Sequence, residues 1–127
     1  MSHFTKIKTK LYNLDTLKKS LSDLNLNWTS NAVGVRGYQG QTHSAELVIK
    51  QDNHHDIGFQ WNGKEYELVT DLMFWSQTYS VDKFLDQINQ RYAYNFILQV
   101  SEKEGFNFTE SKNNQDGSVR LVLRRFR

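Results

Sequence analysis

Three consecutive segments between residues 45 and 69 alternate apolar and polar side chains and are separated by short polar stretches. Alternation with a period of two is typical of β-strands that bury one face. Asn62-Gly63 is a strong hairpin signal, because both residues tolerate the positive φ angles of a type I′ turn. The segments predict an antiparallel meander, which restricts the chain to folds built around a sheet with one buried face.

The apolar positions also predict the register of this meander. A two-residue turn at 62–63 places Phe59 opposite Tyr66. A five-residue loop at 52–56 places Ile49 opposite Phe59. A slip of one residue would move every apolar side chain to the opposite face, so we expect this alignment of faces to be strongly specified.

Residues 13–26 predict an amphipathic helix, with Asn13 or Asp15 as its N-cap. Its apolar positions are spaced by three and four residues: Leu14, Leu17, Leu21 and Leu24. Its expected solvent-facing residues are Lys18, Lys19, Ser22 and Asp23.

A second helix is expected to begin at Ser80 and to end at Gly105 as its C-cap. Its apolar residues continue at helical spacing: Val81, Phe84, Leu85, Ile88, Tyr92, Phe96 and Val100. Residues 92–100 also alternate like a strand, but the unbroken i, i+4 ladder favours the helix.

Further strands are expected at 3–11, 31–41, 106–112 and 118–126. The predicted order is β-α-β-β-β-β-α-β-β, an α+β fold with both helices packed on one face of an antiparallel sheet. At 127 residues the chain is expected to form a single domain, residues 1–127. The glycines of the second strand indicate a bulge, a bend or a close backbone approach: Gly34, Gly37 and Gly40.

The composition excludes several classes of protein. The chain has no cysteine, which excludes disulfides, thiol catalysis and cysteine-bound zinc or iron–sulfur sites. No apolar run approaches the ~20 residues of a membrane span. The first residues alternate like a strand and resemble neither a signal peptide nor a transit peptide. If the protein acts inside an organelle, we therefore expect it to be made there.

Adjacent His54 and His55, flanked by Asp52 and Asp56, raise the question of a metal site. Ligands on one strand face need i, i+2 spacing and ligands on a helix need i, i+4 spacing, so adjacent histidines fit neither pattern. We expect a solvent-exposed turn without metal, although a loop that clasps an ion through Asp52, His54 and Asp56 remains an alternative.

Motifs for catalysis are also lacking. The chain contains no G-x-S-x-G elbow, no phosphate-binding glycine loop and no H-E-x-x-H sequence. Glu65 and Glu67 share a strand face, but a solvated outer face is the simpler interpretation. We expect no enzymatic activity and no cofactor.

Basic residues form two groups near the ends of the chain: Lys6, Lys8 and Lys10, and Arg120 and Arg124. If the first and last strands are neighbours, these residues form a cationic stripe suited to RNA or another polyanion. Charge on edge strands also prevents aggregation, which is the alternative interpretation. The sheet aromatics Phe59, Trp61 and Tyr66 are expected in the core rather than stacked on bases.

Aromatic residues gather in the connection that precedes the second helix: Phe74, Trp75 and Tyr79. Such residues either cap the core or anchor a partner protein. Arg91 and Tyr94 lie off the apolar stripe of the second helix, so they are further candidates for a partner surface.

Several strings occur together in this sequence: MSHFTKIKTK, VRGYQGQT, DIGFQWNGKEYELVTDLMFW, QRYAYN and GFNF…DGSVRLVLRRF. With them the chain resembles the hypothetical chloroplast reading frame family number thirty-five (ycf) of algal plastids and cyanobacteria. The resemblance covers nearly the whole chain. It implies a plastid-encoded protein of the chloroplast stroma, and it supplies no catalytic residues.

Three hypotheses of function follow. The first is a non-catalytic accessory module that binds another protein, for example during assembly of a photosynthetic complex. The second is a module that binds RNA or another polyanion through the basic strands. The third is an enzyme or small-cofactor binder without a recognisable motif.

Overall fold

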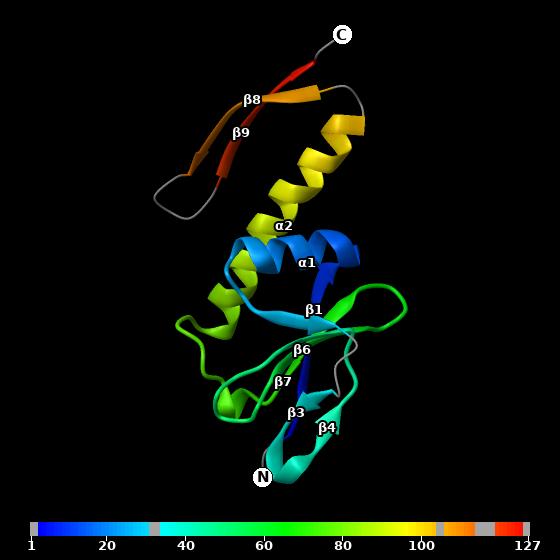
Figure 1. The fold of residues 1–127 in the computed structure, drawn as a ribbon, viewed down its shortest axis with the longest axis vertical. Coiled ribbons are helices and arrows are strands. Elements are labelled where there is room, and N and C mark those ends of the chain that lie inside the picture. Colours follow the sequence, from blue (N-terminus) through cyan, green and yellow to red (C-terminus); the bar gives the residue numbers. More distant parts are fainter. Residues whose placement is uncertain (1–2, 31–33, 104–105, 114–118, 126–127) are drawn as a thin grey trace.

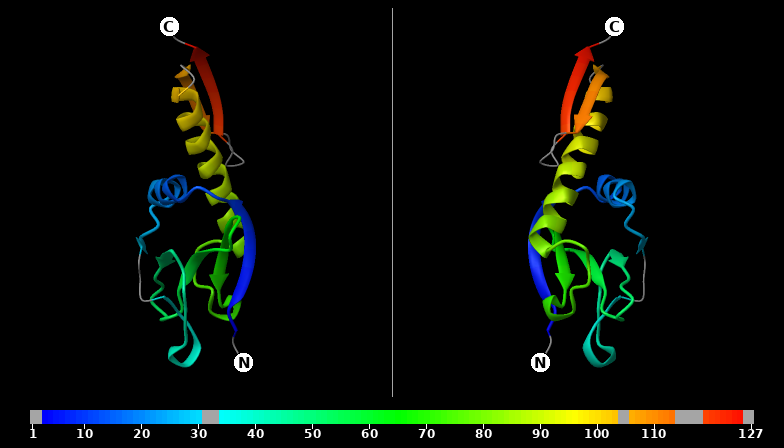
Figure 2. Two further views of the ribbon diagram at one scale, coloured as in Figure 1. Left: turned by 90° about the vertical axis from the view of Figure 1, so that its right-hand side faces the viewer. Right: turned by 90° about the vertical axis from the view of Figure 1, so that its left-hand side faces the viewer.

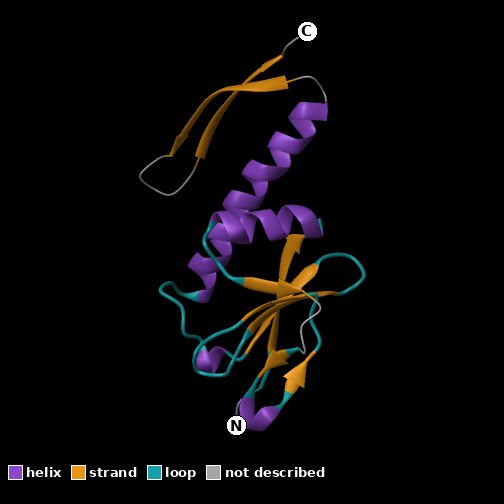
Figure 3. Ribbon diagram, viewed as in Figure 1, coloured by secondary structure: helices purple, strands orange, loops and turns teal. Residues whose placement is uncertain are grey.

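The structure, a computed structural model, describes residues 3–30, 34–103, 106–113 and 119–125. Its main sheet is antiparallel and five-stranded (Figures 1 and 3). In spatial order the sheet contains β1 (Thr5–Leu11), β7 (Tyr66–Thr70), β6 (Ile57–Trp61), β5 (Leu47–Ile49) and β2 (Trp28–Ser30). The two α-helices are α1 (Leu14–Asp23) and α2 (Val81–Lys103).

Two small sheets complete the fold. One contains β3 (Val35–Arg36) and β4 (Thr42–His43), joined through the 3₁₀ turn η1 (Tyr38–Gly40). The other is the hairpin of β8 (Phe106–Asn113) and β9 (Val119–Arg125). α2 extends beyond the main sheet, and this hairpin lies beside its C-terminal half (Figure 2). The predicted α+β class and order of elements are confirmed.

Both helices cover the same face of the main sheet. Leu17 and Leu21 of α1 and Phe84 and Ile88 of α2 pack with the inward residues of the strands, including the fully buried Phe59. The side chain of Asn13 caps α1 by accepting a hydrogen bond from the Thr16 amide, as one of the two predicted caps. Residues 92–100 are helical, as predicted, and Gly105 lies outside the described residues.

The predicted registers of the meander are wrong by two residues at each connection. Tyr66 lies opposite Trp61 rather than Phe59, and Phe59 lies opposite Leu47 rather than Ile49. The second hairpin has a longer turn because the Asn62 side chain accepts hydrogen bonds from the amides of Lys64 and Glu65. A shift of two preserves the faces, so Phe59 and Tyr66 are buried as predicted, whereas Trp61 at the end of β6 is 40% exposed.

The predicted strand at 31–41 is also wrong for most of its described residues, 34–41. Among these, strand structure is limited to β3, and the sheet edge is formed instead by β2, which pairs with β5. β3 lies across the outer face of the main sheet, where the buried Val35 covers Gly58. A Cβ at Gly58 would lie 2.2 Å from Val35 Cγ2, so glycine permits this close layer.

Asp23 was expected to face water, but it lies in the contact between the two helices. Its half-buried carboxylate accepts hydrogen bonds from Arg91 Nε at 2.9 Å and from Asn95 Nδ2 at 3.0 Å. Asn95 also donates to Ser20 Oγ, so the contact between α1 and α2 contains a polar seam beside its apolar core.

Candidate protein-binding surface

Two connections meet at one end of the main sheet. The turn 51–56 joins β5 to β6, and the connection 71–80 joins β7 to α2 through the 3₁₀ turn η2 (Leu72–Phe74). Antiparallel pairing places the end of β5, the start of β6 and the end of β7 together (Figure 1). We call these two connections together the loop platform.

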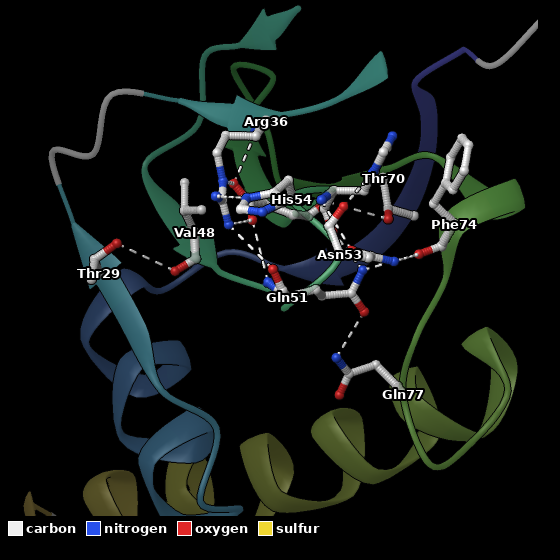
Figure 4. A network of polar contacts seen from close by, with 11 residues as sticks. Thr29, Arg36, Val48, Gln51, Asn53, His54, Thr70, Phe74 and Gln77 are labelled. Carbon is white, nitrogen blue, oxygen red and sulfur yellow. Dashed lines mark hydrogen bonds and ion pairs between the residues drawn. The ribbon is translucent and has the colours of Figure 1, made fainter. Parts of the chain in front are cut away.

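Arg36 and Asp56 form the charged centre of this end. Arg36 Nε and Nη2 each donate to one carboxylate oxygen of Asp56 at 2.8 Å (Figure 4). The Asp56 side chain is fully buried, and it also accepts from the Arg36 and Gln51 amides. Burial raises the pKa of the Asp56 carboxyl, but these hydrogen bonds outweigh burial and hold the pKa below its ordinary value.

Gln51 binds the two connections to each other. Its side-chain nitrogen donates to the Phe74 carbonyl, and its oxygen accepts from Gln77 Nε2 (Figure 4). The nitrogen also donates to the His55 carbonyl, and the oxygen also accepts from the Ser76 amide. Gln51 is only 5% exposed, and each polar atom of its side chain has a partner. This arrangement fixes the path of the connection 74–77.

The histidine pair takes part in the same structure. Arg36 Nη1 lies 2.8 Å from His54 Nδ1, and since a guanidinium only donates, His54 accepts this bond. The His55 ring stacks on Phe74 with 3.8 Å between centroids. Asn53 also donates to the Phe74 carbonyl, at 2.8 Å. Within the predicted turn, His54 is exposed, as expected, whereas the expectation of solvent exposure is wrong for the buried Asp56.

Ligands for a metal do not gather here. Within the described part of the chain, no three His, Asp or Glu side chains lie together in a way that could hold an ion. The oxygens of Asp56 and Nδ1 of His54 are already engaged by Arg36.

The loop platform holds large apolar side chains at the surface. Leu72 is 46% exposed, Met73 is 69% exposed and Tyr79 is 40% exposed. Asp71 caps η2 through a hydrogen bond from the Met73 amide to its carboxylate. Leu72 and Met73 thus stand on a turn whose backbone is fixed by the Asp71 cap and by the bond from Gln51 to the Phe74 carbonyl.

The predicted partner residues separate into two groups. Phe74 and Trp75 are half-buried and contribute to the structure, Phe74 by its stack on His55 and Trp75 by an edge-on contact with Phe84. The Trp75 indole also donates to the Tyr79 carbonyl at 2.8 Å. Tyr79 is the exposed aromatic of the group.

Arg91 and Tyr94 lie elsewhere, on α2. The Arg91 guanidinium lies 4.3 Å from the Tyr94 ring centroid and is bound to Asp23. Arg91 belongs to the polar seam between the helices through Asp23, and Tyr94 contacts Arg91 on α2 rather than the loop platform.

The basic residues do not come together as one stripe. β1 carries Lys6, Lys8 and Lys10 at an edge of the main sheet, whereas β9 carries Arg120 and Arg124 in a separate sheet. Lys8 lies opposite Glu67. Phe59 and Tyr66 are buried beneath the helices, as expected, while Trp61 is 40% exposed.

No pattern in the sequence indicated the central roles of Arg36 and Gln51. Neither residue belongs to a periodic pattern or a motif, and their partners are distant in the chain or in another loop. The range around Arg36 was predicted as a strand with a bulge or bend, and Gln51 was placed next to the histidine turn, so neither was assigned a partner.

The structure defines an α+β protein in which hydrogen bonds hold two connections together at one end of the main sheet. Residues 20–122 match the family described as "Protein of unknown function (DUF1257)". A relative from Guillardia theta, "Uncharacterized protein ycf35", is 49% identical over 127 residues, which is 100% of this chain and 99% of the relative. Relatives of the same name from Pyropia yezoensis and Cyanophora paradoxa are each 41% identical, covering 99% and 100% of this chain and 98% and 99% of theirs.

The chain belongs to this uncharacterised plastid family and is plastid-encoded, which confirms the resemblance seen in the sequence. No solved structure matches the chain significantly. Among the described helices, none has both the length and the apolar character needed to cross a membrane.

Proposed function

We propose that this protein is a non-catalytic accessory module of the plastid stroma that binds another protein through the loop platform. The observation that carries the proposal is the display of Leu72 and Met73 on a turn held in place by Gln51 and Asp71.

Two physical arguments support a binding role. Large apolar side chains grouped at a surface cost solvation free energy, and such groups mark interaction sites in soluble proteins. A recognition loop that is already ordered loses little conformational entropy when it binds. The four hydrogen bonds of the Gln51 side chain supply this order before any partner binds.

The polyanion hypothesis has less support. Lys6, Lys8 and Lys10 are exposed, but Lys8 lies opposite Glu67, and the Lys10 amide donates to the Glu65 carboxylate. Charges of both signs at an edge strand are better suited to preventing edge-to-edge aggregation than to binding the phosphate groups of a polyanion.

The test is an affinity purification of the tagged full chain from stroma, followed by mass spectrometry. A partner recovered with the parent chain should be lost with Leu72→Ser/Met73→Ser. Tyr38→Ser is the matched control, because Tyr38 is an exposed large side chain on the other 3₁₀ turn, η1. Failure to recover any reproducible partner, or equal recovery with both variants, would contradict the proposal.

A further inference from the structure

A groove runs between the end of α1 and the start of α2, beside the loop platform. Its deeper part is a cavity of about 160 Å³ between Leu24 and Leu26 on one side and Phe84 and Ile88 on the other. Tyr79, the last exposed aromatic of the platform, lines this cavity. Leu26 is also a wall of a second, shallower hollow, which Trp28 lines. The two hollows thus adjoin at Leu26.

The lining of the groove is uncharged. Phe84 and Ile88 form a buried apolar floor, and the amides of Gln77 and Gln87 stand at the cavity wall. An apolar cavity of about 150 Å³ accepts a molecule the size of benzene. The cavity therefore fits one leucine- or phenylalanine-sized side chain, and the neighbouring amides suit the peptide groups beside it.

Each of the two hollows has a lysine over one of its aromatic lining residues. Lys83 Nζ lies 4.8 Å from the centroid of Tyr79, and Lys18 Nζ lies 5.5 Å from that of Trp28. The carboxylate in the last turn of α1, Asp23, is already matched by Arg91 and Lys19. Each hollow thus has a positive charge beside one of its rings.

We propose that this groove binds a short extended segment of the partner protein, with one bulky apolar residue in the cavity and acidic residues on both sides of it. The inference rests on the proposed function and names the chemistry of the partner. Charge complementarity selects the acidic flanks, cavity volume selects the single apolar anchor, and Tyr79 makes the groove continuous with the loop platform.

The test uses an array of nine-residue peptides and the fluorescently labelled full chain. The central residue is Leu, Phe or Ala, and the flanking residues are Glu, Ser or Lys. We expect the strongest binding for Leu or Phe between glutamates, weaker binding with serine flanks, and a loss with the alanine centre. Equal binding of glutamate- and lysine-flanked peptides, or indifference to the central residue, would overturn the inference.

A charge reversal on the protein provides the second arm. Lys18→Glu/Lys83→Glu should weaken the best peptide by roughly tenfold, with the loss reduced at high salt. Lys64→Glu is the matched control, because Lys64 is an exposed lysine in the turn after β6. An unchanged affinity in the double variant would overturn the inference.

The two proposals fail in different ways. A stromal partner that is lost with Leu72→Ser/Met73→Ser but retained with Lys18→Glu/Lys83→Glu would keep the loop platform as the binding surface and reject the groove. An absence of any stromal partner would reject the proposed function itself, whatever the peptide array shows.

Discussion

The carboxylate of Asp56 and the guanidinium of Arg36 form two parallel hydrogen bonds of 2.8 Å between residues that are 20 positions apart in the chain. The Asp56 amide also donates to the Arg36 carbonyl at 2.9 Å. These bonds attach β3, which covers the outer face of the main sheet, to the turn that precedes β6. The pair therefore joins the outer layer, the main sheet and the loop platform at one point.

Removal of Arg36 should destabilise the protein substantially. In Arg36→Ala the fully buried Asp56 side chain loses its counter-charge, and breaking such a pair costs about 3 kcal/mol. Urea denaturation at pH 7 measures this cost. Lys19→Ala is the control, because the exposed Lys19–Asp23 pair is worth at most about 0.5 kcal/mol. Equal stabilities of the two variants would contradict the assigned role.

The same pair predicts a pH dependence. Because the folded-state pKa of Asp56 is below its unfolded value, its stabilisation is present above about pH 4 and is lost as the pH falls through the folded pKa. In Arg36→Ala the effect of burial is no longer outweighed, so it raises the pKa of the Asp56 carboxyl. Protonation of Asp56 then stabilises the folded state of this variant. The difference in unfolding free energy between the parent and Arg36→Ala should narrow from pH 7 to pH 4. A difference that stays constant over this range would refute the mechanism.

Gln51→Leu should loosen the loop platform. The change leaves the Ser76 amide and the His55 carbonyl without their partner, at a cost of about 2 kcal/mol. Hydrogen exchange at the Ser76 amide should become faster, and capture of the stromal partner should fall. Gln60→Leu is the control, since Gln60 makes one exposed hydrogen bond to Ser44. Unchanged protection at Ser76 would show that Gln51 does not order the connection.

Gly58→Ala should cost about 2 kcal/mol, because its Cβ would lie 2.2 Å from Val35 Cγ2 in a packed layer. Shortening Val35 to alanine removes that clash. The cost of Gly58→Ala should therefore be smaller in a Val35→Ala background, as a double-mutant cycle of unfolding free energies would measure. Additive costs would mean that the close approach of β3 is not what requires glycine at this position.

Local periodicity predicted much of the fold. Apolar spacing identified both helices, and alternation identified the strands from β5 to β7 together with the faces that they bury. The predicted strand register was wrong by two residues because apolar alternation is unchanged by a shift of two. The length of the turn between β6 and β7 depends instead on the hydrogen bonds of the Asn62 side chain. β2 was missed because three residues with one half-buried side chain are too short to show a period.

The candidate surface also has features that follow from local sequence patterns and features that do not. The spacing of side chains along the chain was enough to predict both helices, the strands from β5 to β7 with the faces that they bury, and the concentration of aromatic residues before α2. The pairing of Arg36 with Asp56, the bonds by which Gln51 joins two connections, and the positions of Lys18 over Trp28 and of Lys83 over Tyr79 are visible only in the folded arrangement. Those contacts depend on which strands become neighbours in the sheet, and pairing between distant segments leaves no periodic trace in the sequence.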